Sequence, residues 1–154
     1  MIDTVRDFLD DNGFRYEYNV ENKYLQLNFG LECKLKKARV IFEFRQAGYI
    51  VYAVSPINAD KDNLGEMLKY IAMANYGLAN GNFEVDVRDG EVRYKSWVGT
   101  RKLDSYPADM VDESLSVPLL MMDRYGDGIA ALSMGFSDAD TEIAKAEKSD
   151  EDGD

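Results

Sequence analysis

The sequence predicts an α+β domain, in which helices pack on an antiparallel sheet of five to six strands. Apolar and polar residues alternate along several segments between residues 14 and 55, which is the period of a strand with one buried face. Residues 60–78 instead carry apolar side chains at helical spacing. Two further alternating runs flank an Asp-Gly pair, which is typical of a hairpin. The expected order is a helix, three or four strands, a helix, a hairpin and a final helix.

The N-terminal half supplies the first helix and most of the strands. Val5, Phe8 and Leu9 have helical spacing within residues 4–11, and Asn12-Gly13 provides a stop signal. The strands are expected at residues 14–18, 24–36, 37–44 and 49–55. The last of these strands reads YIVYAVS and is apolar on both faces. It is therefore either a central strand or a strand that supplies a contact surface.

The second helix, expected from about Asp60 to Leu78, carries Asn75 on its apolar stripe. An amide in that position needs hydrogen-bond partners, because leaving it unpaired costs about 1–3 kcal/mol. Two interpretations stay open. Asn75 either ties the end of the helix to the following hairpin, or contacts a small ligand in a pocket between helix and sheet near Tyr94.

A two-residue type I′ turn at Asp89-Gly90 is expected to set the register of the hairpin. It would place Val85 opposite Tyr94 on an apolar face. The other face would carry three pairs of opposite charge, namely Arg88/Glu91, Asp86/Arg93 and Glu84/Lys95. We interpret these carboxylates as structural, since acid–base or metal chemistry would require burial that perturbs a pKa.

The C-terminal part begins with helical spacing at residues 109–115 and then meets Pro118. A proline inside a helix costs about 3 kcal/mol, so the sequence predicts a kink or break near Ser116-Val117, or a fresh helix that starts there. Gly126 and Gly128 on the following stripe suggest the close approach of another backbone. The expected single domain covers residues 1–136, and residues 137–154 are expected to form an acidic, partly disordered tail.

The charge of the chain argues against polyanionic partners. Its formal net charge is −11, and residues 137–154 contribute eight acidic residues and two lysines to it. Neither part of the chain has the basic footprint that nucleic acid requires, so no nucleic-acid partner is expected. No membrane partner is expected either, because the chain has no apolar run near the roughly 20 residues that span a bilayer.

The residue types also limit the chemistry that the chain could perform. It contains no histidine, which removes the commonest general base and the commonest zinc ligand. The single cysteine, Cys33, falls on the apolar side of an alternating segment and fits a reducing cytoplasm. The N-terminal residues lack the basic start and apolar stretch of a secretory signal. We therefore expect a cytoplasmic protein that is not an enzyme and has no catalytic residue, metal site or cofactor.

Three segments in order resemble the YbjN-like family of bacterial proteins. They are YAVSPINA at residues 52–59, ANYGLANGNFEVDVRDGEVRYK at 74–95 and VPLLMMDRYGDGIAAL at 117–132. Members of that family are labelled as regulators of sensory transduction and are related in fold to type III secretion chaperones. The resemblance covers roughly residues 1–146 and implies an α+β fold in the order already expected. It implies no catalytic residues, and secretion chaperones with this fold act as dimers that hold partner segments.

The leading functional hypothesis is a non-enzymatic, chaperone-like module that binds a protein partner and regulates it. Two long helices can cover one face of a sheet, which would leave the second apolar face of the strand at 49–55 for a partner or a second copy of the chain. The candidate contact residues are Tyr49, Ile50, Tyr52 and Val54. The alternatives are a small-ligand sensor with a pocket near Asn75 and Tyr94, and an enzyme that uses carboxylates.

Overall fold

Six antiparallel strands form one sheet in the computed structural model, which describes residues 1–101 and 107–148. The sheet order is β1-β2-β3-β4-β6-β5. The strands are β1 (Glu17–Asn19), β2 (Tyr24–Gly30), β3 (Lys37–Arg45), β4 (Gly48–Val54), β5 (Asn82–Val85) and β6 (Val92–Gly99). The helices are α1 (Ile2–Asp11), the short 3₁₀ helix η1 (Lys61–Asn63), α2 (Leu64–Tyr76), α3 (Ala108–Ser133) and α4 (Ala139–Glu147). The predicted α+β class, strand number and element order are confirmed.

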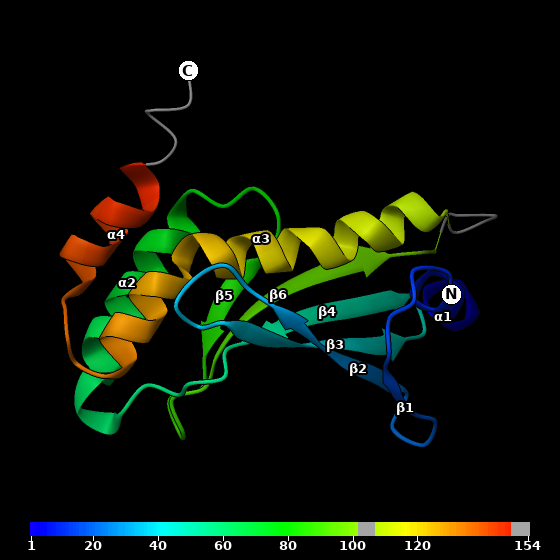
Figure 1. Cartoon of the computed structure of the whole chain (residues 1–154), viewed down its shortest axis with the longest axis horizontal. Coiled ribbons are helices and arrows are strands. Elements are labelled where there is room, and N and C mark those ends of the chain that lie inside the picture. Colours follow the sequence, from blue (N-terminus) through cyan, green and yellow to red (C-terminus); the bar gives the residue numbers. More distant parts are fainter. Residues whose placement is uncertain (102–106, 149–154) are drawn as a thin grey trace.

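The helices lie on one side of the sheet (Figure 1). The long helix α3 runs over β4 and β6, while α2 packs beside β5. Helix α4 packs on α2 and α3, and α1 contacts α3 at the other end of the layer. The described helices thus cover one face of the sheet and leave the other face without a helix.

The core lies between the sheet and this helical layer. Cross-strand rows on the covered face bring buried side chains together, and α3 supplies the opposing apolar side chains. The sheet contributes Leu25, Leu27, Val40, Phe42, Val51, Ala53, Phe83 and Tyr94, and α3 contributes Val111, Leu115, Met122 and Ile129. Burial of apolar area at about 25 cal/mol per Å² is the main source of stability for such an arrangement.

Strand β4 lies in the interior of the sheet, between β3 and β6. Its Tyr49, Val51 and Ala53 point to the core and are fully buried. Since side chains alternate along a strand, Ile50 and Tyr52 point to the opposite face. The interpretation of this doubly apolar segment as a central strand is confirmed.

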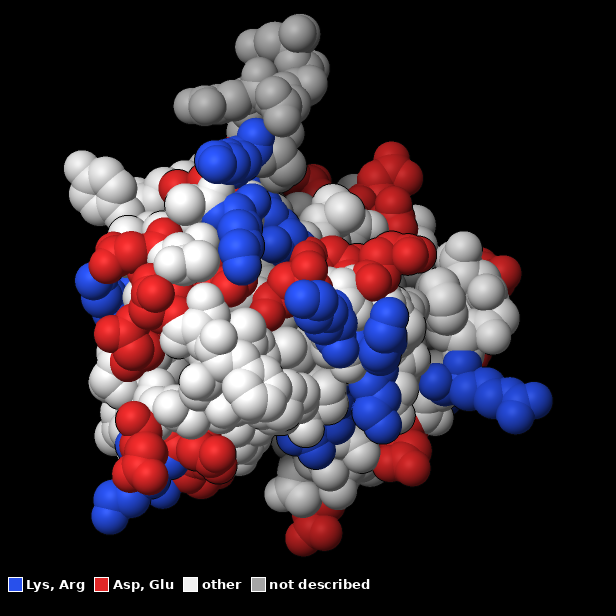
Figure 2. All heavy atoms as spheres, turned by 60° about the vertical axis from the view of Figure 1, so that its left-hand side comes forward, with Lys and Arg blue, Asp and Glu red and all other residues white. Residues whose placement is uncertain are grey.

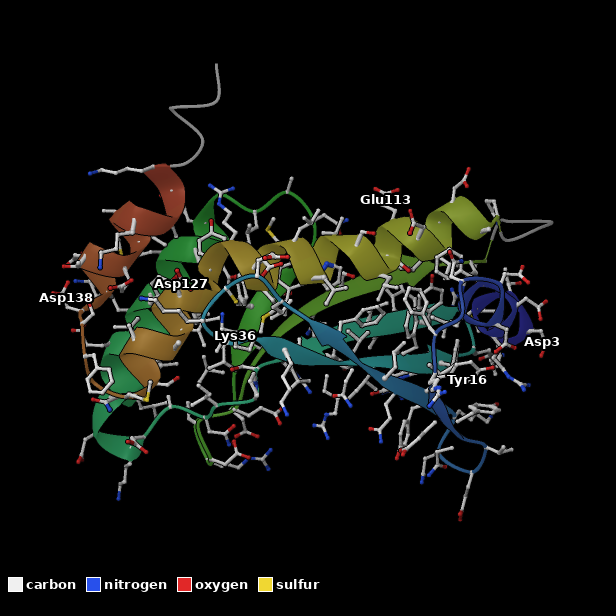
Figure 3. The ribbon with its side chains drawn as sticks, in the orientation of Figure 1. Asp3, Tyr16, Lys36, Glu113, Asp127 and Asp138 are labelled. Carbon is white, nitrogen blue, oxygen red and sulfur yellow. The ribbon has the colours of Figure 1, made fainter. Side chains whose placement is uncertain are left out.

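The strand expected at residues 24–36 is shorter than the alternation indicates. It ends at Gly30, and residues 31–36 form a loop, although their apolar side chains remain buried. Asp123 of α3 accepts a hydrogen bond from the backbone N–H of Cys33 at 3.0 Å, and Asp127 accepts one from Lys34 at 2.8 Å. Asp127 lies next to this loop in Figure 3. Carboxylates of α3 therefore accept hydrogen bonds from backbone N–H groups of the loop, as a neighbouring strand would do for a strand.

Helix α3 continues through Pro118, so the expected break near Ser116-Val117 is wrong. Pro118 itself is buried, and the apolar stripe of the helix continues on both sides of it against the sheet. Packing along the full length of the helix outweighs the lost backbone hydrogen bond. The close approach of another backbone expected at Gly126 and Gly128 is wrong, because the atoms that lie against these glycines belong to side chains, chiefly those of Cys33 and Tyr70.

The packed fold extends beyond the boundary expected at residue 136. The predicted tail begins with α4, whose Ala139 and Ile143 are buried against the other helices. Asp138 caps α4 by accepting hydrogen bonds from the backbone N–H of Thr141 at 2.8 Å and from its hydroxyl at 3.0 Å. Two apolar side chains and a good cap therefore hold the first part of the segment in place, and the partly disordered tail stays a prediction. Residues 149–154 lie outside the described residues.

The predicted register of the hairpin is wrong by two residues. Val85 faces Val92 and not Tyr94, because the connection is longer than the expected two-residue turn. A shift of two residues preserves the alternation of the faces. Of the three predicted ion pairs, Glu84/Lys95 is confirmed. The other two are rearranged, since Arg93 also bonds Glu84, and Asp86 bonds Arg88.

Side-chain hydrogen bonds explain the longer turn. Among its residues only Gly90 has a positive φ, of 79°, whereas a type I′ turn needs two such residues. The Asp86 carboxylate accepts the backbone N–H of Arg88 at 2.9 Å, and the Asp89 carboxylate accepts that of Glu91 at 3.0 Å. Aspartates that bond the backbone two residues further on stabilise turns of this kind.

Two glycine substitutions should have opposite effects. Gly90→Ala should lower the free energy of unfolding by more than about 1 kcal/mol, since a methyl group at this positive φ would overlap the backbone of Ala59. Gly65→Ala, in the exposed first turn of α2 with open space around it, should raise that free energy by about 0.5 kcal/mol. Urea unfolding measures both values. A Gly90→Ala protein as stable as the wild type would contradict the turn described here.

The Asp86–Arg88 ion pair predicts a pH-dependent stability. The side-chain and backbone hydrogen bonds from Arg88 lower the pKa of Asp86 to about 2. Because the folded state then favours the carboxylate, the stabilisation is present above about pH 4 and disappears as the pH falls towards 2. The stability difference between wild type and Asp86→Asn should vanish over that interval, as measured by thermal unfolding. Asp62→Asn, at an exposed position, is the control; an unchanged Asp86→Asn difference at low pH would refute the prediction.

Candidate functional site

The face of the sheet that the helices leave uncovered is the candidate site, and we call it the open face. In Figure 3 its side chains project from the sheet into a region without any ribbon. The cross-strand register defines its members. They are Glu17, Asn19, Tyr24, Gln26, Asn28, Lys37, Arg39, Ile41, Glu43, Arg45, Ile50, Tyr52, Val54, Asn82, Glu84, Arg93, Lys95 and Trp97.

Five apolar or aromatic side chains form a strip across the middle of the open face. We call Ile41, Ile50, Tyr52, Val54 and Trp97 the apolar strip. Ile41 pairs with Tyr52 across β3 and β4, and Ile50 pairs with Trp97 across β4 and β6. Trp97 is the most exposed member, with 52% of its surface accessible. The strip is therefore an apolar row in which Trp97 is open to solvent, Ile41 and Ile50 are half-buried, and Tyr52 and Val54 are buried.

A cation covers the centre of the apolar strip. The guanidinium of Arg93 lies over the ring of Tyr52, 4.2 Å from its centroid, so only 8% of Tyr52 is accessible. Burial, followed by the nearby charge of Glu43, raises the pKa of the Tyr52 phenol. The phenol is therefore neutral at ordinary pH and available as a hydrogen-bond donor.

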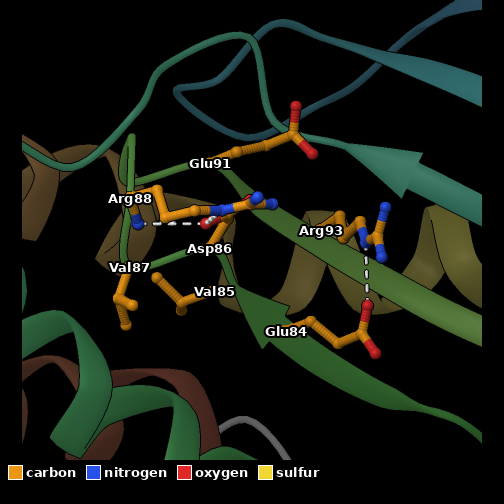
Figure 4. A pocket seen from close by; sticks show the side chains of 7 residues that line it. All are labelled: Glu84, Val85, Asp86, Val87, Arg88, Glu91 and Arg93. Carbon is orange, nitrogen blue, oxygen red and sulfur yellow. Dashed lines mark hydrogen bonds and ion pairs between the residues drawn. The ribbon is translucent and has the colours of Figure 1, made fainter.

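Glu84 holds two of the cations of the open face. Its carboxylate accepts a hydrogen bond from Arg93 Nε at 2.8 Å (Figure 4) and another from Lys95 Nζ. Burial acts to raise the pKa of Glu84, but the hydrogen bonds from Lys95 and Arg93 outweigh it and keep the pKa below its usual value. Glu84 therefore fixes the side chain of Arg93 in its place above Tyr52.

Arg39 differs from these paired cations. Within residues 1–101 and 107–148 it makes no ion pair, and it lies between Asn28 and Val54 in a cross-strand row. It lines two shallow depressions of the open face, of about 270 and 680 Å³. Arg15 lines the smaller depression and Glu43 the larger one. A guanidinium beside an apolar surface can receive a carboxylate.

The structure divides the candidate contact residues between the two faces of the sheet. Ile50, Tyr52 and Val54 belong to the open face, as the alternation predicts. Tyr49 belongs to the core, where it is fully buried and its hydroxyl shares a hydrogen bond of 2.9 Å with that of Ser114. A contact surface on β4 therefore excludes Tyr49.

Asn75 and Tyr94, the residues of the candidate pocket, have structural partners. Asn75 accepts the backbone N–H of Phe83 at 2.7 Å and donates to its carbonyl at 3.0 Å. The amide thereby makes the two backbone hydrogen bonds that a neighbouring strand would make with Phe83 at the outer edge of β5. Tyr94 is fully buried, and its hydroxyl donates to the carbonyl of Asn80. The interpretation of Asn75 as a tie between helix and hairpin is confirmed; a ligand pocket beside it stays a prediction.

The clustered carboxylates of the hairpin border a shallow depression of about 610 Å³ (Figure 4). Glu84 and Asp86 are each bonded to cations, as already described, and Glu91 lies on the opposite side of the depression. In the part of the chain that the structure describes, no three Asp, Glu or Cys side chains are placed to hold a metal ion.

The rest of the surface carries mixed charges. At the end of the molecule with α2 and α4, Figure 2 shows acidic and basic groups interspersed. None of the described helices combines the length and the apolar character needed to cross a membrane.

Four important residues of the open face escaped the sequence analysis. Ile41 and Arg39 lie on the polar side of their alternating strand, and Arg93 was assigned to a different ion pair. Trp97 follows the last alternating position considered, so its face was not predicted. The signal that could have found Trp97 is the continued alternation from Arg93 through Lys95. The stacking of Arg93 on Tyr52 depends on the pairing of β4 with β6, which no local pattern shows.

Comparison with known proteins yields a match in structure but not in sequence. No family model matches the chain, and neither does any curated protein. A solved structure, that of YbjN from E. coli, described as "a putative transcription regulator", matches with a TM-score of 0.59. The match covers 80% of this chain and 86% of YbjN, with 11% sequence identity. The chain thus has the fold of YbjN, and the fold expected from the resemblance is confirmed.

Proposed function

We propose that the chain is a non-enzymatic, regulatory module that binds a protein partner through the open face of its sheet. One observation carries this proposal. The helices cover a single face of the sheet, and the apolar strip lies on the other face, with Trp97 half exposed. Exposed apolar strips with polar rims are typical of protein-binding surfaces, and tryptophan, tyrosine and arginine are the residues that most often dominate their binding energy.

Two further observations support binding rather than catalysis. The carboxylates of Glu84 and Asp86 are held by cations, which stabilises their charged form and suits a structural role. The depressions of the open face are shallow and broad, which fits a polypeptide better than a small substrate.

The regulatory part of the proposal comes from the fold. YbjN, which shares the architecture, is described as "a putative transcription regulator". Fold alone does not determine function, so this support is an analogy. The partner is either another protein or a second copy of the chain, and the experiment below separates these two cases.

Photo-crosslinking should find a partner on the open face. A photoreactive phenylalanine analogue at Trp97, introduced in cells of the source organism, should give a protein adduct. The same analogue at Leu120, which is 61% exposed on the outer side of α3, is the matched control and should give none. An adduct of about twice the 17.4 kDa chain would identify a second copy, and any other mass a different protein.

A second substitution shows whether the adduct depends on the apolar strip. Ile50→Glu should remove the adduct at Trp97, because it places a charge beside that residue on the neighbouring strand. Circular dichroism must show that the variant is folded. Equal adducts from Trp97 and Leu120, or none from either position, would count against the proposed function.

A further inference from the structure

We propose that the partner of the open face is an extended acidic segment of another protein, whose carboxylates pair with Arg39 and whose apolar side chains lie on the apolar strip. This inference rests on the proposed function and specifies the chemistry of the partner. Three properties of the open face support it, namely the sign of its charge, the pairing of its ions and the position of Arg39.

The open face has a charge opposite to that of the rest of the chain. Its strands present five cations and three anions, namely Lys37, Arg39, Arg45, Arg93 and Lys95 against Glu17, Glu43 and Glu84. Removing these from the 18 basic and 29 acidic residues of the chain leaves 13 basic and 26 acidic residues elsewhere. A local excess of cations on such an acidic chain favours the approach of an anionic group.

The anions of the open face already have partners. Glu84 bonds Arg93 and Lys95, Glu43 bonds Arg45, and Glu17 accepts a hydrogen bond from Gln26 at 2.8 Å. Arg39 and Lys37 are the cations of this face that have no ion pair within the described ranges. Within the described ranges the open face therefore has two cations without an ion pair, Arg39 and Lys37, against one such carboxylate, Glu17, which leaves an excess of unpaired positive charge.

The position of Arg39 determines the form of the partner. It lies on β3, two strands from β6 and four residues along the sheet from Trp97. Strands are about 4.8 Å apart and rise about 3.3 Å per residue, so Arg39 and Trp97 are roughly 16 Å apart. An extended segment covers that distance with about five residues. One carboxylate on Arg39 and one apolar side chain against Trp97 thus fit a short extended peptide.

Charge also disfavours the other occupants of the open face. In a two-fold dimer the same surface of both copies meets itself, so two faces with excess cations would come together. Nucleic acid would need several phosphate contacts, whereas the open face has two unpaired cations on a chain of net charge −11. A short acidic segment needs only those two cations. Salt screens the repulsion between the segment and acidic residues that lie more than about 8 Å from it.

Trp97 is the only tryptophan of the chain and gives a direct readout of binding. The probe is a capped ten-residue peptide, added to the full-length protein, in which glutamate and leucine alternate at the odd positions, on one face of the extended segment, and threonine fills the even positions. Peptides with glutamine or lysine in place of glutamate are the matched controls. The glutamate peptide should shift the Trp97 emission in a saturable manner, and binding should weaken as salt rises from about 50 to 500 mM.

Three charge variants test the role of Arg39. Arg39→Glu should weaken binding of the glutamate peptide about tenfold, because an attraction becomes a repulsion. Glu84→Gln should strengthen binding about two- to threefold, since it releases Arg93 and Lys95 from their shared carboxylate. Lys61→Glu makes the same charge change as Arg39→Glu on η1, away from the open face, and should leave binding unchanged.

Several outcomes would overturn this inference. If the glutamine peptide binds as tightly as the glutamate peptide and Arg39→Glu has no effect, the open face binds apolar segments without regard to charge; the proposed function then stands. Tighter binding of the lysine peptide, or of a twelve-residue oligothymidylate, would identify a partner of another class. If no peptide shifts the emission and light scattering shows a dimer that shields Trp97, the occupant is a second copy. If no probe binds and the Trp97 crosslink is also absent, the proposed function fails as well.

Discussion

The packing of α3 along β4 and β6 is the contact on which the rest of the structure depends. This helix runs the length of the sheet, where Val111, Leu115, Met122 and Ile129 supply the apolar layer opposite the strands. A buried hydrogen bond between Tyr49 and Ser114 ties the helix to the central strand. Helices α1, α2 and α4 each contact α3, so its position places all of them on the same side. One long helix thereby determines which face of the sheet becomes core.

One-sided cover leaves β4 with a second apolar face that none of the described helices covers. A charged side chain covers part of that face: Arg93 lies over Tyr52, and a hydrogen bond to Glu84 fixes its position. A guanidinium above an aromatic ring keeps its charge in contact with water and shields the ring. Little favourable hydration is therefore lost when a partner covers the pair. Trp97 lacks such cover and lies at the edge of the protected area. Most of the apolar strip is thus shielded from solvent in the free chain, while Trp97 stays accessible.

Alternation with a period of two predicted the strands and the face to which each side chain belongs. That assignment survived the wrong hairpin register, because the pairing moved by two residues and not by one. The register itself was not predictable, since Asp86 and Asp89 stabilise a longer turn through hydrogen bonds that the Asp-Gly pair does not indicate. The break expected at Pro118 was wrong for a related reason: local propensity argued against a continuous helix there, and packing on distant elements overrode it. The ion pairs of the open face depend on which strands are neighbours, which local patterns do not show.

The match to YbjN, at 11% identity, concerns the fold, which requires a packed core on the covered face of the sheet. Residues of the covered face are explained by packing alone. The open face of a half-covered sheet needs only polar or modestly apolar side chains, so packing does not demand an exposed tryptophan or an unpaired arginine there. Trp97 and Arg39 are therefore the residues whose presence calls for an explanation in function.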